Sequence, residues 1–294
     1  MEYPSLDKPT AGAFRFNTDS SQLEIYDGNQ WTGVLATSPE QQTGGTRGLT
    51  MGGYTSPTFT NVIEYINIAT TGNAADFGDL NALLQDPMAV ASRTRGISGG
   101  GLSYPGPAYV NTVQAVTISS TGNSVDFGDL TAARNTISGG GNSTRGIYCG
   151  GNPNSKTNII DFVEISTTGN ASDFGDLTVE KRNAGKGQAS NATRHIVYGG
   201  QITPSVTNSI EFVTIATLGN GIDFGDASTP IESSMAMASP TRAVFAGGNE
   251  NDDTTHTRID SMEFTTRGEV TSFGTLAPSA ASGGVGISNG HGGL

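Results

Sequence analysis

Pairs of aspartates are the most regular chemical feature of this sequence. Ca²⁺ binds six to eight oxygens, several of them from carboxylates, but two carboxylates separated by Phe-Gly do not make an EF-hand loop. Aspartates in turns more often accept hydrogen bonds from backbone N–H groups. We therefore expect a structural role, predict no metal and no cofactor, and keep Ca²⁺ as the alternative. The pairs are Asp76 and Asp79, Asp126 and Asp129, Asp173 and Asp176, and Asp223 and Asp226.

Arginines recur with similar regularity, each directly after a threonine. Because repetition follows architecture, we expect each arginine to pair with an acidic group of its own or the next structural unit. A ring of arginines that binds an anion is the alternative. The three histidines, His195, His256 and His291, lack the spacing of a zinc site. The arginines are Arg47, Arg95, Arg145, Arg194 and Arg242.

Catalytic motifs give little support to an enzyme. No Gly-x-Ser-x-Gly lies between a strand and a helix, and Cys149 stands in an apolar stretch where a small core residue is expected. Glycoside hydrolysis needs only two carboxylates. A catalytic pair should be unique in the sequence, however, whereas nearly every acidic residue here recurs in register. We expect no enzymatic activity and keep a glycosidase as a remote alternative.

Charge and composition restrict the partners. With 27 Asp and Glu against 15 Lys and Arg, the net charge is -12, so the chain lacks the basic face that nucleic acids and anionic membranes require. Residues 1 to 10 contain no apolar signal region, and no apolar run is long enough to span a membrane. We expect no nucleic acid, no membrane insertion and no secretory signal. The 42 glycines favour tight turns over helices.

A repeat explains why these residues recur. Thr-Arg followed by an apolar pair and Gly-Gly begins at Thr46, Thr94, Thr144, Thr193 and Thr241, with spacings of 48, 50, 49 and 48 residues. A second phrase, Asp-Phe-Gly-Asp, keeps the same period and is degraded to Ser272-Phe273-Gly274-Thr275 in its fifth copy. Periods of about 40–50 residues with several short strands indicate the blades of a β-propeller.

Each unit predicts several short strands, such as 146–149 and 158–165 in the third copy. A more polar segment, 182–190 in that copy, leads into the next Thr-Arg, while residues 81–85 are ambiguous and have weak helical character. The first unit lacks such a preceding segment, and residues 280–289 resemble it. We therefore predict an all-β fold in which the C-terminal strand completes the first blade of a closed five-bladed propeller. An open array with a frayed tail is the alternative.

The units resemble kelch motifs in their Gly-Gly pair, in an acidic residue on the next strand (Glu64, Glu164, Glu211) and in an arginine before the following unit. The usual kelch tryptophan is absent, and the phenylalanine of Asp-Phe-Gly-Asp takes a comparable place. More closely, Asp-Phe-Gly-Asp-Leu-Thr and the ending 288–294 resemble kelch-like structural proteins of marine cyanophages and related tailed phages. This resemblance covers about residues 43 to 294 and implies a component of the virion surface, in the capsid or the tail, assembled in the host cytoplasm and present in multiple copies.

Residues 1–38 lie outside the period and predict a three-stranded β-meander, with residues 39–45 as a linker and 46–294 as the propeller. Three short strands bury too little apolar area for independent stability. We expect the meander to attach the chain to other virion proteins, or else to fold onto its own propeller. The candidate attachment residues are Phe14, Phe16, Ile25, Tyr26 and Trp31.

Two functions remain compatible with these patterns. One is structural display on the capsid or tail, including a tail fibre. The other is lectin-like recognition of host surface glycans, in which many weak contacts add up to avidity. The loop 102–109 interrupts the repeat, and its Tyr104 and Tyr109 could stack on sugar rings or simply cap the blade.

Overall fold

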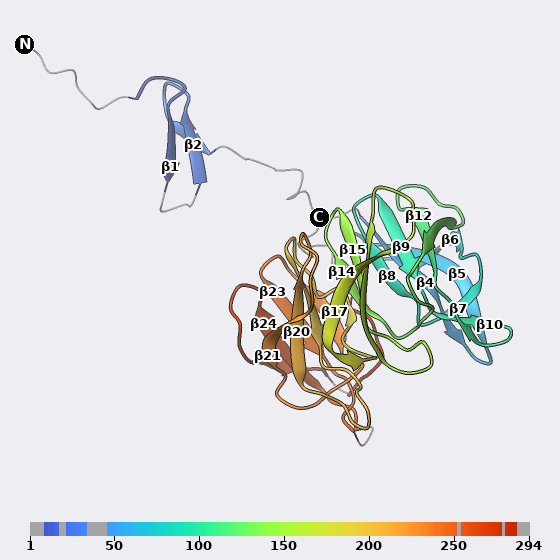
Figure 1. The fold of residues 1–294 in the computed structure, drawn as a ribbon. Coiled ribbons are helices and arrows are strands. Elements are labelled where there is room, and N and C mark those ends of the chain that lie inside the picture. Colours follow the sequence, from blue (N-terminus) through green and yellow to red (C-terminus); the bar gives the residue numbers. More distant parts are fainter. Residues whose placement is uncertain (1–8, 18–21, 34–45, 252–253, 278–279, 287–294) are drawn as a thin grey trace, which may run out of the picture. The chain divides into compact units, whose positions relative to one another are not determined.

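The computed structural model describes residues 9–17, 22–33, 46–251, 254–277 and 280–286, which contain strands and no helix. The chain divides into two compact units, residues 1–42 and residues 43–294 (Figure 1). The all-β prediction is thus confirmed. Within the described ranges, no helix is long and apolar enough to cross a membrane.

Unit 1 is a small antiparallel meander of β1 (Phe14–Asn17), β2 (Gln22–Tyr26) and β3 (Trp31–Gly33). Asp27 closes the turn between β2 and β3, because its Oδ1 accepts the N–H groups of Asn29 and Gln30, each at 2.7 Å. These two hydrogen bonds lower the pKa of the Asp27 carboxyl. The aspartate and glycine of this turn explain why the hairpin forms here.

Unit 2 contains one main antiparallel sheet for each sequence repeat (Figure 1). The first strand of the second, third and fifth sheets comes from the end of the preceding repeat. The sheets are β4 (Arg47–Thr55), β5 (Thr58–Asn67) and β6 (Ala75–Asp79); β8 (Met88–Ala91), β9 (Arg95–Gly99), β12 (Thr112–Thr117) and β13 (Val125–Asp129); β14 (Ser138–Gly141), β15 (Arg145–Cys149), β16 (Thr157–Glu164) and β17 (Ser172–Lys181); β19 (Arg194–Tyr198), β20 (Ser209–Thr214) and β21 (Ile222–Asp226); and β22 (Met235–Ala238), β23 (Arg242–Ala246), β24 (Arg258–Glu263) and β25 (Thr271–Thr275).

Short strands complete unit 2. β7 (Leu83–Gln85), β10 (Leu102–Tyr104) and β11 (Ala108–Tyr109) form a small sheet, so the ambiguous stretch 81–85 contains strand and no helix. In the polar segment 182–190, the only strand is β18 (Lys186–Gly187), which runs parallel to β22.

The core of unit 2 lies between neighbouring sheets. The described residues form four clusters of buried apolar side chains, and each cluster joins one repeat to the next. Tyr198 of the fourth repeat, for example, stacks on Phe245 of the fifth with ring centroids 4.0 Å apart. Because the strands are apolar on both faces, a single sheet cannot bury its apolar area, and the sheets depend on each other.

The Asp-Phe-Gly-Asp phrase forms the backbone connection between repeats. In β13 the phenylalanine is the extra residue of a β-bulge, because Val113 pairs with Gly128 and Gln114 with Asp126. The Phe127 carbonyl accepts the N–H of Gly169 in the next repeat at 2.8 Å. Phe77, Phe174 and Phe224 accept the N–H of Gly122, Gly219 and Gly268 in the same way.

The chain after β25 follows the path taken after earlier repeats. Gly248 N donates to Ala281 O at 2.8 Å, as Gly200 N does to Ile231 O. Gly283 N donates to Ser233 O, and Gly286 forms a parallel bridge with Gly187. Residues 280–286 thus contact Gly187 of the third repeat, Ser233 of the fourth and Gly248 of the fifth, and within the described residues no pairing of this segment with β4 is seen. The remainder of the predicted closing strand, 287–289, lies outside the described residues.

Candidate functional site

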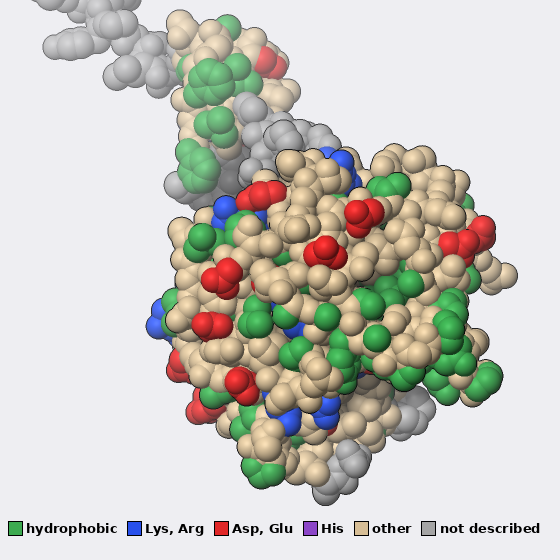
Figure 2. All heavy atoms as spheres, turned by 45° about the vertical axis from the view of Figure 1, so that its right-hand side comes forward, with side chains coloured by type: hydrophobic (Ala, Val, Ile, Leu, Met, Phe, Trp, Pro, Cys, Tyr) green, Lys and Arg blue, Asp and Glu red, His purple; other side chains and the backbone are tan. Residues whose placement is uncertain are grey.

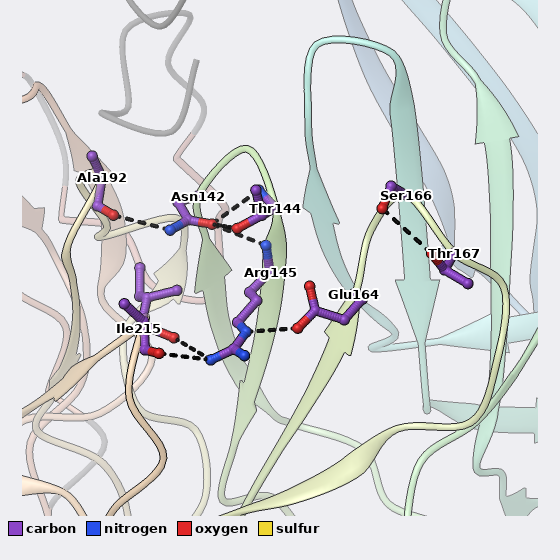
Figure 3. A network of polar contacts seen from close by, with 9 residues as sticks. Asn142, Thr144, Arg145, Glu164, Ser166, Thr167, Ala192 and Ile215 are labelled. Atoms are coloured by element: carbon purple, nitrogen blue, oxygen red, sulfur yellow. Dashed lines mark hydrogen bonds and ion pairs between the residues drawn. The ribbon is translucent and has the colours of Figure 1, made fainter.

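Four of the five repeated arginines link their repeat to the next, mainly through backbone carbonyls. Arg145 Nη1 donates to Ile215 O at 3.1 Å, and its Nε donates to Glu164 in its own repeat at 2.8 Å (Figure 3). Arg47 and Arg95 donate in the same way to Ile118 O and Ile165 O, and Arg194 to Phe264 O. The expected acidic partner is present for Arg145 and for Arg242, which binds Glu263 at 2.7 Å. For Arg47, Arg95 and Arg194, the main partner is a backbone carbonyl in place of the carboxylate that we expected.

A turn before each of two arginines adds to these links. The amide oxygen of Asn142 accepts the N–H groups of Thr144 and Arg145, while its nitrogen donates to Ala192 O in the next repeat (Figure 3). Asn191 repeats the arrangement and donates to Pro240 O. One asparagine thus both shapes the turn and holds the neighbouring repeat.

Buried charges are paired across repeat boundaries. Arg134 lies 2.9 Å from Asp161, and Lys181 lies 2.6 Å from Glu211, with all four side chains excluded from solvent. Asp161 also accepts hydrogen bonds from the N–H and hydroxyl of Thr131. Separating either pair would leave an uncompensated buried charge, so the pairs disfavour other arrangements of the neighbouring repeats.

His195 and Cys149 are buried and inaccessible to a substrate. His195 is fully buried, its Nδ1 lies 3.0 Å from Ser190 Oγ, and burial lowers its pKa to about 4. Burial also raises the pKa of the Cys149 thiol, which disfavours the nucleophilic thiolate. Both side chains therefore belong to the packing of the repeats.

The paired aspartates behave differently from the prediction. We expected their carboxylates to accept turn N–H groups, but the cross-repeat bonds at this phrase involve its backbone. Asp129 N donates to the Asn170 side chain, and Asp129 O accepts from Ala171 N. The first aspartate of each pair is solvent-exposed. The described part of the chain contains no group of three or more His, Cys, Asp or Glu side chains placed to hold a metal ion.

Unit 1 separates its candidate attachment residues onto two faces. The register pairs Phe14 with Ile25 and Phe16 with Leu23, so these four side chains share one face. Phe14 and Phe16 are 64% and 63% exposed. Apolar side chains on the surface of this unit are visible in Figure 2.

On the opposite face of unit 1, the aromatic and charged side chains contact one another. Tyr26 is buried against Trp31, with ring centroids 5.4 Å apart. Arg15 lies over the Trp31 ring at 4.4 Å and pairs with Glu24 at 2.7 Å. The hydrogen bonds from Asn17 and Arg15 lower the pKa of the Glu24 carboxyl. Of the five candidates, Phe14 and Phe16 are therefore the most available to a partner.

The two tyrosines of the candidate sugar-binding loop have different surroundings. Tyr104, on β10, is exposed and packs edge-on against Phe59, which in turn packs against Tyr54. Tyr109, on β11, is half-buried, and its hydroxyl accepts a hydrogen bond from Asn152 at 3.0 Å. Tyr54 and Phe59 were missed in the sequence, although their hairpin follows Gly52-Gly53 as the Tyr104 hairpin follows Gly100-Gly101.

A groove of about 790 Å³ lies between the first and fifth sheets. Ile66, Ile68 and residues 70–72 line it on one side, and Met237, Ala238 and Val244 on the other. The two ends of the repeat array therefore face each other across one groove. On the face seen in Figure 2, acidic side chains are spread over the surface and basic ones are sparse.

Comparison with known proteins does not assign the chain to a family. No protein-family model matches the chain, and a search of curated proteins finds no match.

Proposed function

We propose that this chain is a non-enzymatic structural protein of a phage virion surface, in the capsid or the tail. The observation that carries the proposal is the five-fold Thr-Arg and Asp-Phe-Gly-Asp repeat, which resembles the kelch-like repeats of phage structural proteins. Four of the five repeated arginines, and the glycine of each complete Asp-Phe-Gly-Asp phrase, contact the neighbouring repeat. This use of the recurring residues favours a display scaffold over a catalyst.

We further propose that unit 2 closes into a five-bladed propeller. Four junctions share one set of contacts, and the first and fifth repeats line the same groove. The path of residues 280–286 repeats the path between earlier blades. A fifth junction, between the first and fifth repeats, would then close the array into a ring.

Unit 1 is the proposed attachment element. Its exposed face with Phe14 and Phe16 presents apolar area that another virion protein would bury. Changing both residues to serine should abolish incorporation of the chain into particles while unit 2 stays folded. The matched control is Thr32→Ser, an exposed position of β3. Normal incorporation of the Phe14→Ser, Phe16→Ser variant would remove the attachment role.

Glycan recognition is the second candidate function, and the cluster of Tyr54, Phe59 and Tyr104 favours it. Aromatic rings that present an exposed face can stack on the apolar face of a sugar. Purified protein should then bind host cells in a pull-down experiment. Binding no greater than that of a denatured control would eliminate this candidate and leave the structural role untouched.

A further inference from the structure

Apolar residues at the two ends of the array are exposed where their counterparts are buried. Phe273 is 55% exposed, whereas the equivalent phenylalanines of the other four repeats are 2–3% exposed. Ile66 and Ile68 are 37% and 41% exposed, whereas Val213 and Ile215 at the same positions of the fourth repeat are 1% and 0% exposed. The first and fifth repeats thus carry the two halves of a fifth hydrophobic cluster.

Polar groups at these ends are equally complementary. In the third repeat, the guanidinium of Arg145 holds both Glu164 and the carbonyl of Ile215 in the next repeat. Arg242 already holds the matching carboxylate, Glu263. The carbonyl that corresponds to Ile215 belongs to Ile68, and Ile68 lines the groove.

A carboxylate of the first repeat likewise matches a backbone donor of the fifth. Asp161 and Glu211 accept the N–H groups of Thr131 and Thr178 in the preceding repeats, at 3.0 and 2.7 Å. Their counterpart in the first repeat is Glu64, which is exposed, and the matching donor is the N–H of Ala277.

An asparagine completes the set. Asn170 and Asn220 accept the N–H groups of Asp129 and Asp176 through their side-chain oxygens, at 3.1 and 3.0 Å. Their counterpart in the first repeat is Asn73, and the matching donor in the fifth is the N–H of Thr275. A foreign ligand would have to reproduce this whole pattern by coincidence.

We propose that the partner of each end is the other end of the same chain. Arg242 binds the Ile68 carbonyl, Glu64 accepts from Ala277 N, Asn73 accepts from Thr275 N, and Phe273 is buried against the first repeat. The inference rests on the proposed closed ring and names the contacts that lock it. It commits to closure within one chain because both surfaces already line one groove.

An engineered disulfide tests this junction. At the second junction, Ala171 N donates to Asp129 O at 2.7 Å, and the same positions at the fifth are Ala74 and Thr275. Residues joined by a backbone hydrogen bond fall within the Cα separations that a disulfide spans. The test variant is Ala74→Cys, Thr275→Cys, and the matched control is Ala171→Cys, Asp129→Cys, both oxidised in dilute full-length protein.

We expect both variants to form an intramolecular disulfide, seen as faster migration in a non-reducing gel and a loss of two hydrogens in the intact mass. A cross-link in the control but none in the test variant would overturn the junction. Disulfide-linked dimers of the test variant would assign the two surfaces to neighbouring copies and overturn closure within one chain. Because the experiment uses isolated protein, it is independent of virion incorporation, which tests the proposed function.

Discussion

The glycine of the Asp-Phe-Gly-Asp phrase is required by close contact between repeats. Gly128 has φ +148°, and a Cβ at this position would lie 2.4 Å from the carbonyl oxygen of Gly169. The glycines of the other complete copies meet the next repeat in the same way. A side chain here would both strain the backbone and push two repeats apart.

Gly128→Ala should therefore lower the free energy of unfolding by more than about 2 kcal/mol, since backbone strain and steric overlap add. Gly169→Ala is the matched control, because a Cβ on Gly169 meets nothing within 4 Å. Its cost should remain near that of an ordinary surface substitution, about 0.5 kcal/mol. Urea unfolding of both variants measures the difference. Equal stabilities would show that the repeats do not meet as closely as described.

His195 makes stability depend on pH. Burial lowers its pKa from 6.5 to about 4, so between these values the unfolded chain binds a proton that the folded chain excludes. This contribution is fully present above pH 6.5 and is lost as the pH falls toward 4, amounting to about 3 kcal/mol.

Unfolding free energies of the parent protein and of His195→Ala, measured from pH 8 to pH 4, test this contribution. The variant should lose less stability than the parent over that range, whatever its stability at pH 8. His256→Gln is the control, because His256 is partly exposed. An unchanged pH slope in His195→Ala would contradict the assigned cause.

The repeat spacing predicted which residues serve the contacts between repeats. It did not predict the atoms in the neighbouring repeat that they contact. The period showed that the arginines link units, and Arg145 does so. It could not show that the acceptor is the carbonyl of Ile215, because backbone carbonyls leave no signature in a sequence. For the same reason, the aspartates drew attention to their side chains, whereas the bulged backbone makes the cross-repeat bonds.

Among the strands and hairpins, the hairpins that follow the first two Gly-Gly pairs bring aromatic side chains from two repeats together. Phe59 on β5 and Tyr104 on β10 lie with ring centroids 5.6 Å apart. The hairpin of Tyr104 was recognised as an interruption of the repeat, but its neighbour in the first repeat was not. Contacts between loops 45 residues apart follow from the way the sheets are placed, which periodicity alone does not give.

If this cluster binds sugars, Tyr104→Ala should weaken binding to host-cell glycans about threefold to tenfold, the loss expected for one stacking ring. Tyr109→Phe should bind normally, because it removes only a hydroxyl that is engaged by Asn152. A glycan array read by fluorescence compares the two variants. Equal losses in both, or in neither, would remove Tyr104 from the binding surface.

Strand positions were the most predictable feature of the elements. The runs 158–165 and 210–215 correspond to β16 (Thr157–Glu164) and β20 (Ser209–Thr214) within one residue, because β-branched and aromatic residues fill both faces. The polar segments between repeats were harder, and β18 occupies only Lys186–Gly187. The strands in these polar segments depend more on pairing with a neighbouring sheet than on their own residues, as β18 does on β22.

Over the whole molecule, the proposed ring consists of five sheets of three to five strands, joined by five junctions. Four junctions have a buried apolar cluster and matching backbone hydrogen bonds, and two of them also have a buried charge pair. Equal spacing in the sequence predicts equal sheets. Spacing cannot distinguish a ring from an open array, because both use the same contacts between neighbours and differ only at the two ends.

Amide hydrogen exchange at the two ends of the array distinguishes a closed ring from an open array. In a closed ring, the N–H groups of Gly72, Thr275 and Ala277 are hydrogen-bonded across the fifth junction. They should exchange as slowly as their counterparts Gly122, Asp129 and Thr178, whose bonds are formed within the array. Exchange of the three end amides at the rate of an unfolded chain, with the counterparts still protected, would contradict closure.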